Sequence, residues 1–120
     1  MNDIYVSKHF KLKEFECRDN HTVKLYKELI DRLEIFRSLI GSRPIYINSG
    51  FRTPEYNKLI GGVKNSQHVK GRAVDIKKID NMDIDVMSEY AKKAGFTGIG
   101  KYHWGIHVDI RPYQARWDNR

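Results

Sequence analysis

The stretch from His103 to Ile110 is the feature that most restricts how this chain can fold. It reads HWGIHVDI, so apolar residues alternate with a second set that includes His103, His107 and Asp109. Side chains of a β-strand point alternately to opposite faces. The pattern therefore predicts a strand with one buried apolar face and one face that carries two imidazoles and a carboxylate. An ordinary solvent-facing strand surface would carry Lys, Thr, Glu or Ser, so this face indicates a functional site.

Asp75 is a second unusual acid, because it lies inside the apolar run Ala73-Val74-Asp75-Ile76. A buried carboxylate is costly unless it is paired or bound to a metal. One interpretation is an ion pair with Arg72, and the other is a metal ligand. His68 lies seven residues upstream in a polar segment, where a single histidine is most often an ordinary surface residue.

Taken together, His68, Asp75 and His107 offer two imidazoles and one carboxylate, which are the donor types of catalytic zinc sites. Such sites use three protein ligands and leave a fourth position for water, whose pKa the zinc lowers. The chemistry also needs a base for that water and a donor for the oxyanion. Since Cys17 is the sole cysteine, neither an intramolecular disulfide nor a cysteine-based zinc cluster is available.

Periodicity along the chain predicts an α+β fold in which helices flank a small, mainly antiparallel sheet. The 120 residues suit a single domain, 1–120, with one core. Helices are expected at 22–40, with Thr22 as N-cap and Gly41 as the stop, at 53–60 and at 83–94, with a short helical turn at 12–15. Strands are expected at 45–50, 73–76, 98–102 and 104–111, with a loop at 63–72 and a loosely packed polar tail at 112–120.

The chain carries 22 Lys and Arg against 15 Asp and Glu, a formal charge of +7. This charge favours polyanionic partners such as nucleic acid or the anionic polymers of a bacterial wall. The cations form no stripe and no helix-turn-helix pattern is present, so a nucleic-acid partner is not expected. No apolar run approaches the ~20 residues that span a bilayer, and the first residues lack the apolar region of a secretory signal.

Three blocks of sequence resemble the zinc D-Ala-D-Ala metallopeptidases, a family grouped with lysostaphin-type enzymes and the hedgehog signalling domain. The first is Ser49-Gly50-Phe51-Arg52-Thr53-Pro54. The second is Ser66-x-His68 with Gly71, Ala73 and Asp75. The third combines Gly98-Ile99-Gly100 with His107-Val108-Asp109. The resemblance extends over residues 8–112 and is strongest to the short peptidases of phages and prophages.

The resemblance implies a role for each matching residue. His68, Asp75 and His107 correspond to the ligands of one zinc ion, and Arg52 to the arginine that polarises the scissile carbonyl and holds the oxyanion. Ser66 corresponds to a residue that contacts substrate or orders the ligand loop. A structural ion pair for Arg52 and a purely loop-stabilising hydroxyl for Ser66 are the alternatives.

One position departs from the family. Three residues before the last histidine the family usually has an acidic base, and here that position is Trp104, which cannot accept a proton. His103 is the nearest replacement, either by strand alternation or through a bulge at Gly105. Asp109 is the other candidate, as a base or as a group that orients an imidazole.

The function expected from the resemblance is hydrolysis of peptide bonds next to D-amino acids in peptidoglycan, by a carboxypeptidase or by an endolysin-like endopeptidase. The alternative is a module on the same fold that recognises wall peptide or a protein without cleaving it. The expected partners are the stem peptide and anionic wall polymers, and the protein is expected to be a monomer. A phage enzyme made in the cytoplasm and released to the wall would fit the lack of a signal sequence.

Overall fold

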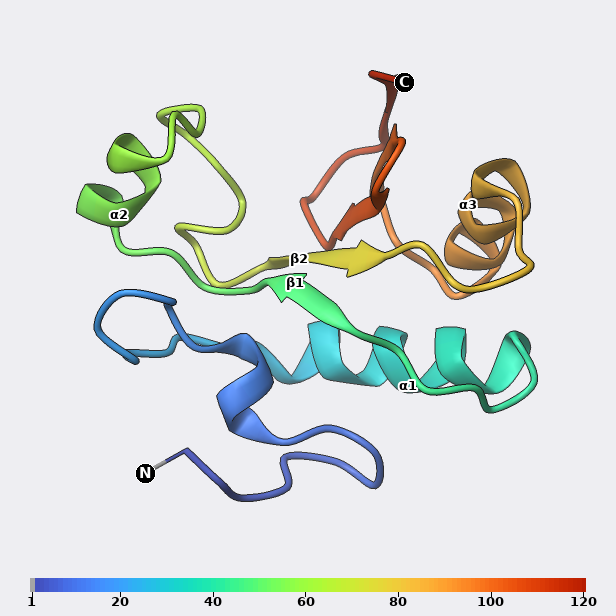
Figure 1. The fold of residues 1–120 in the computed structure, drawn as a ribbon, viewed down its shortest axis with the longest axis horizontal. Helices are drawn as coiled ribbons and strands as arrows, with labels where there is room; N and C mark the ends of the chain where they lie inside the picture. The colour runs from blue at the N-terminus through green and yellow to red at the C-terminus, as the bar shows by residue number, and fades with distance from the viewer. Residues whose placement is uncertain (1) are drawn as a thin grey trace.

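The computed structural model describes residues 2–120 and is built on one five-stranded sheet in the order β1-β2-β4-β3-β5 (Figure 1). The strands are β1 (Ile47–Ser49), β2 (Ala73–Lys77), β3 (Gly98–Tyr102), β4 (Gly105–Asp109) and β5 (Ala115–Asp118). The pairs β1–β2, β2–β4 and β3–β4 are antiparallel, and β3–β5 is parallel. The expected α+β class with a mainly antiparallel sheet is confirmed.

The helical elements are η1 (Leu12–Phe15), α1 (Lys27–Leu39), α2 (Pro54–Leu59) and α3 (Ile84–Lys93). In Figure 1, α1 runs beneath β1 and β2, and α3 lies at the opposite end of the sheet from α2. The core holds Val74, Ile76, Ile106 and Val108 from the sheet, packed with apolar side chains of α1 and α3 such as Leu33, Phe36 and Met87. Each such side chain contributes roughly 1.5–3 kcal/mol by leaving water, so this apolar face fixes which way the alternate residues point.

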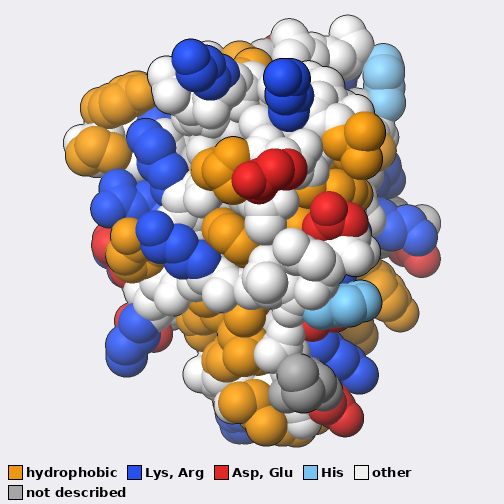
Figure 2. All heavy atoms as spheres, turned by 90° about the vertical axis from the view of Figure 1, so that its left-hand side faces the viewer, with side chains coloured by type: hydrophobic (Ala, Val, Ile, Leu, Met, Phe, Trp, Pro, Cys, Tyr) orange, Lys and Arg blue, Asp and Glu red, His pale blue; other side chains and the backbone are white. Residues whose placement is uncertain are grey.

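The Lys and Arg side chains are distributed over the surface, as the sequence predicts, and are not concentrated in one patch. On the face shown in Figure 2, Lys and Arg side chains are spread among apolar and neutral ones and form no single stripe. None of the helices within residues 2–120 combines the length and apolar character that a membrane crossing requires.

The first long helix is shorter than its periodicity predicts. It begins at Lys27, with Tyr26 at the N-cap position, so the expectation of an N-cap at Thr22 is wrong. Thr22 lies instead in a turn, where its carbonyl accepts from the Cys17 amide over 2.7 Å and its Oγ donates to Asn20 over 2.8 Å. The predicted stop is confirmed, because Gly41 follows the C-cap with φ of 88°.

The capping of the other two helices follows the sequence closely. Thr53 caps α2 by accepting a hydrogen bond from the Tyr56 amide over 3.1 Å, and Pro54 occupies the first turn. Asp83 caps α3 in the same way through the Asp85 amide at 3.0 Å.

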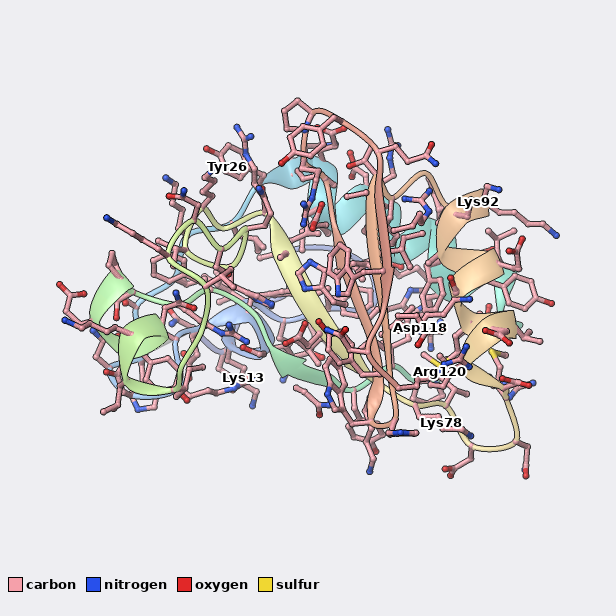
Figure 3. All side chains as sticks on the ribbon, turned by 90° about the horizontal axis from the view of Figure 1, so that it is seen from above. Lys13, Tyr26, Lys78, Lys92, Asp118 and Arg120 are labelled. Atoms are coloured by element: carbon pink, nitrogen blue, oxygen red, sulfur yellow. The ribbon has the colours of Figure 1, made fainter. Side chains whose placement is uncertain are left out.

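The C-terminal tail is where the sequence-based expectation is wrong. Residues 115–118 form β5, and the Ala115 and Asn119 amides each donate to the backbone around β3 over 2.9 Å. The chain end is also held, since Arg120 lies 2.7 Å from Asp118 and 3.0 Å from Asp85 of α3 (Figure 3). The tail has too few apolar residues for an alternating pattern, so periodicity gave no signal of this strand.

Candidate metal centre

Three side chains converge on the polar face of the sheet. Strand register pairs Asp75 of β2 with His107 of β4, and His68 reaches the same place from the loop before β2. The nearest oxygen of Asp75, Oδ1, lies 3.1 Å from Nε2 of His68 and 3.1 Å from Nδ1 of His107. All three residues are buried, and their donor atoms lie within 4.8 Å of one another. We call His68, Asp75 and His107 the metal triad.

Each imidazole of the metal triad is held at its far nitrogen. His68 Nδ1 donates to the Gly50 carbonyl over 2.8 Å, and His107 Nε2 donates to Asp109 Oδ2 over 2.7 Å. These bonds keep a proton on the outer nitrogen of each ring, so the inner nitrogen is the one left to offer a lone pair to a cation once it carries no proton. With a cation bound, two lone pairs and a carboxylate oxygen would face one point. The donor set and its outer hydrogen bonds fit zinc.

Neighbouring Asp and His side chains stabilise the charged forms of Asp75 and His107. Burial alone would raise the pKa of Asp75, but hydrogen bonds and charge from His107 and His68 hold that pKa well below its usual value. Burial alone would lower the pKa of His107, but the hydrogen bonds that this imidazole donates to Asp109 and Asp75 hold that pKa above its usual value. The site thus keeps Asp75 ionised, as a ligand must be.

Asp109 lies behind His107 and does not reach the open side of the site. It is fully buried, and Arg111 holds it through Nε and Nη2 at 2.9 and 2.6 Å. Burial alone would raise the pKa of Asp109, and the bonds from His107 and Arg111 outweigh that effect. Of the two roles considered for Asp109, this geometry is that of a group that orients an imidazole.

Two glycines of β3 make room for this arrangement. A Cβ on Gly98 would lie 2.1 Å from Oδ1 of Asp109, and one on Gly100 would lie 2.2 Å from the Trp117 ring. The two glycines of the Gly98-Ile99-Gly100 block are therefore explained by the close packing of Asp109 and Trp117 against β3.

Arg52 lies at the opposite side of Asp75 from the imidazoles. Its Nη2 is 3.2 Å from Asp75 Oδ2, its Nε donates to Ser49 at 3.0 Å, and its Nη1 donates to Asn57 at 3.2 Å. The ion pair of Asp75 is thus with Arg52, whereas the Arg72 guanidinium stacks on the Tyr26 ring at 4.8 Å. Each terminal nitrogen of Arg52 carries a second N–H, which remains available to a substrate.

Ser66 is buried at the start of the ligand loop. Its Oγ accepts a hydrogen bond from the His68 amide over 3.1 Å, which fixes the turn that presents His68. This contact is the loop-ordering role that the sequence suggested, and Ser66 also lines the cavity described next. A contact between Ser66 and substrate stays a prediction.

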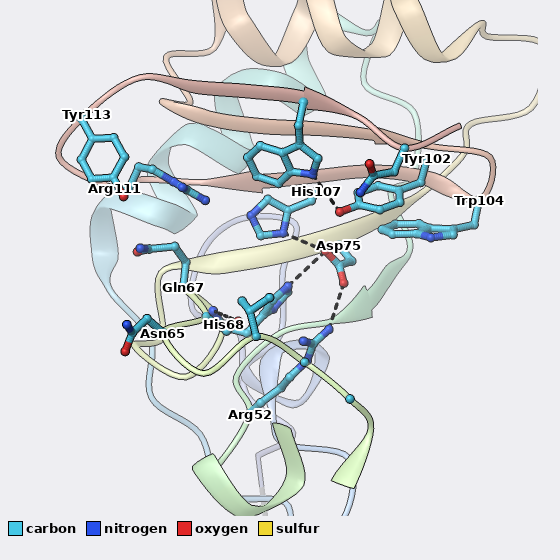
Figure 4. A pocket seen from close by; sticks show the side chains of 16 residues that line it. Arg52, Asn65, Gln67, His68, Asp75, Tyr102, Trp104, His107, Arg111 and Tyr113 are labelled. Carbon is cyan, nitrogen blue, oxygen red and sulfur yellow. Dashed lines mark hydrogen bonds and ion pairs between the residues drawn. The ribbon is translucent and has the colours of Figure 1, made fainter. Parts of the chain in front are cut away.

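An open cavity of about 670 Å³ lies over the metal triad (Figure 4). We call it the groove. Its lining includes the metal triad, Arg52 and Ser66, and on one side three aromatic residues that we call the aromatic wall: Tyr102, Trp104 and Trp117. The Trp117 ring lies 5.1 Å from that of His107, and the Tyr102 and Trp104 rings stack at 4.7 Å. The cavity could hold an extended peptide across the triad.

His103 is not brought to the groove. His103 and Trp104 form the turn between β3 and β4, where His103 is exposed and is absent from the described lining. Gly105 pairs in register with Lys77 and with Tyr102, so no bulge forms there. The expectation that alternation or a bulge would put His103 beside His107 is wrong, because β4 begins only at Gly105 and His103 lies in the turn before it.

Several residues of the site gave little sequence signal. Asn57 is buried and holds Arg52, Arg111 holds Asp109, and Trp117 covers Gly100. The bonds of Asn57 and Arg111 are short-range side-chain contacts that periodicity does not mark, and Trp117 lies beyond the last strand that the pattern shows. Only Arg111 could have been suspected, from its place two residues after Asp109.

A buried His-Asp-His triad, open to a groove on one face of an α+β sheet, has the ligand types of the catalytic zinc-site class. The chain belongs to the peptidase M15 family, whose model matches residues 8–110. It is also 32% identical over 89 residues to a zinc D-Ala-D-Ala carboxypeptidase of Streptomyces albus G. That match covers 74% of this chain and 32% of the relative, so the chain spans about a third of its length. The resemblance to the zinc D-Ala-D-Ala metallopeptidases is confirmed.

Proposed function

We propose that this chain is a zinc-dependent peptidase that hydrolyses peptide bonds next to D-amino acids in bacterial peptidoglycan. The observation that carries the proposal is the metal triad, with both imidazoles fixed at their outer nitrogens so that the inner ones face Asp75. The M15 family and the name of the Streptomyces relative support the same reaction and substrate class.

His68, Asp75 and His107 are the residues that would hold the zinc ion. When bound, zinc polarises a carbonyl and lowers the pKa of a water molecule. Arg52 then donates its free N–H groups to the carbonyl oxygen of the scissile bond, while its bonds to Ser49 and Asn57 keep the guanidinium in place. The groove positions the peptide across the triad, and the aromatic wall shields one side from water.

The charges in the groove bear on which bond is cut. Both guanidinium groups in its described lining are already paired, Arg52 with Asp75 and Arg111 with Asp109. No lysine is among these lining residues, so a free C-terminal carboxylate would meet no unpaired cation. This supports an endopeptidase, in which the substrate continues on both sides of the bond, over a carboxypeptidase.

A non-hydrolytic recognition module is the second candidate, and one observation favours it. Trp104 occupies the position of the family's usual base, and the described lining of the groove has no carboxylate besides Asp75. A module of this kind would keep zinc and bind wall peptide without releasing products.

The test combines metal analysis with product analysis. Elemental analysis should give one zinc per chain, lost in His68→Ala and kept in His9→Ala, since His9 pairs with Glu34 away from the groove. Mass spectrometry of digested wall should show fragments cut next to a D-amino acid. Zinc without any fragments would favour the recognition module. Stem peptides with a free or an amidated C-terminus separate the two enzyme types, because an endopeptidase cuts both and a carboxypeptidase only the free form.

Association with anionic wall polymers is proposed at a second hollow, of about 380 Å³, near the end of β2. It is lined by Arg43, Lys77 and Lys78, none of which forms an ion pair with a described carboxylate, and by the 70% exposed Tyr46. Asp80 is its only acidic lining residue within the part of the chain described. We call this the basic hollow. A basic surface of this kind would suit a phage enzyme that is made in the cytoplasm and released to the wall. The proposal also includes a monomeric state and the lack of a nucleic-acid partner.

A further inference from the structure

Tyr102 lies on the polar face of the sheet beside the metal triad. It is the last residue of β3, and two residues before it Gly100 pairs with His107 on one side and Trp117 on the other. Strand alternation therefore puts Tyr102, Trp117 and His107 on one face. Tyr102 lines the groove, and its ring is stacked on Trp104 with an angle of 17° between the planes.

The hydroxyl of Tyr102 has a defined partner on one side only. Trp117 Nε1 lies 2.8 Å from it, and an indole nitrogen can only donate, so the phenolic oxygen accepts this bond. No acceptor for the hydrogen of the Tyr102 hydroxyl is found among the described side chains and carbonyls. Figure 4 shows the hydroxyl end of Tyr102 turned toward His107, with Arg52 on the other side of Asp75. The free hydrogen is thus available to a molecule in the groove.

We propose that Tyr102 is a catalytic hydrogen-bond donor that stabilises the oxyanion formed when the peptide carbonyl is attacked. This inference rests on the proposed function and adds a second donor, across the triad from Arg52. Trp117 is the positioning residue, because its N–H occupies a lone pair of the phenol and leaves the O–H as the group that faces the substrate. The stack on Trp104 limits rotation of the ring, so that the donor is in place before the reaction.

The test is Tyr102→Phe, which removes the hydroxyl and keeps the ring and its stack. Zinc content should stay at one per chain, and kcat on a wall-derived peptide should fall by about 10²–10³-fold with little change in KM, because the donor acts in the transition state. A phosphinate dipeptide, whose tetrahedral phosphorus carries an anionic oxygen, should bind at least about tenfold more weakly. Binding of the product peptide should be unchanged. Tyr90→Phe removes a phenol of α3 outside the groove and should leave every value unchanged.

Equal kcat and equal phosphinate affinity in wild type and Tyr102→Phe would overturn the inference. If Tyr102→Phe loses the fold, Trp117→Phe carries the test, because it leaves the hydroxyl present without its orienting bond. It should lower kcat and phosphinate affinity together, and unchanged values would again overturn the inference. A wild-type chain that binds zinc but cleaves no wall peptide would instead overturn the proposed function.

Discussion

The Nε2 atom of His107 lies 2.7 Å from Oδ2 of Asp109, and Arg111 holds the same carboxylate from its other side. Asp109 is 0% exposed, so this charge is shared between the imidazole and the guanidinium without competition from water. The bond fixes both the tautomer and the direction of a metal ligand. Removal of this hydrogen bond should therefore weaken zinc binding.

Asp109→Asn should weaken zinc binding and activity together, by about 10–100-fold, as is typical when a group that orients a ligand is changed. The amide has lost the charge that balances Arg111 and that keeps the proton on Nε2 of His107. Zinc affinity can be measured by competition with a chromophoric chelator. Asp118→Asn is a matched control, since Asp118 also binds an arginine two residues later, Arg120, but on the surface. Equal zinc affinity in the two variants would contradict the prediction.

Gly98→Ala should lower zinc affinity although it substitutes none of the three zinc ligands. The new Cβ would lie 2.1 Å from Asp109, so the carboxylate must move away from His107. Gly41→Ala separates this effect from general destabilisation, because Gly41 has φ of 88° and no atom within 4 Å of a new Cβ. Thermal unfolding should show both variants destabilised, and chelator competition should show weaker zinc binding only in Gly98→Ala.

Arg52→Ala should lower turnover by about 10²-fold or more, as for the loss of an oxyanion donor. All three zinc ligands remain, so the metal content should stay close to one per chain. Arg18→Ala, which removes an exposed guanidinium bound to the Ile47 carbonyl, is the control. A fully active Arg52→Ala, or one that fails to fold, would leave the arginine with a structural role alone.

His103→Ala tests the proposal that this residue is the base. The side chain is exposed in the β3–β4 turn and does not line the groove, so the geometry predicts that zinc content and kcat remain near wild type. Steady-state kinetics on a soluble wall peptide give the answer. Loss of most activity with zinc retained would show instead that the turn closes over the groove during the reaction.

Reversing two charges of the basic hollow, with Arg43→Glu and Lys77→Glu together, should weaken retention on purified walls by about tenfold or more, at roughly 1 kcal/mol per cation near an anionic surface. Hydrolysis of a short soluble peptide should not change. Lys93→Glu is a matched control, because Lys93 lies 5.7 Å over a tyrosine ring much as Lys77 does at 5.8 Å. Cosedimentation with walls before and after removal of their phosphate polymers makes the measurement. Equal retention of all variants would contradict the prediction.

The sequence predicted the parts of the site that depend on local pattern. Period-2 alternation in β4 put His107 and Asp109 on one face, and the acid inside an apolar run marked Asp75. The pattern failed at His103 because a tight turn and a strand end look alike in a stretch this short. It failed at Trp117 because its place is set by contacts with Gly100 and Tyr102 of another strand. It failed at Asn57 because a single polar residue on a short helix carries no periodic signal, although its partner Arg52 lies only five residues away. The start of α1 was misplaced for a related reason, since the turn at Cys17 competes with helix propensity.

The parallel strand β5 has a consequence for how such an enzyme can change. The metal triad lies within residues 68–107, whereas β5 supplies Trp117 from residues 115–118 and pairs with β3 alone. The residue that orients Tyr102 is therefore encoded outside the stretch that holds the three zinc ligands. Exchange of the last strand between relatives, by laboratory recombination or by natural drift, would change one wall of the groove while every zinc ligand keeps its place.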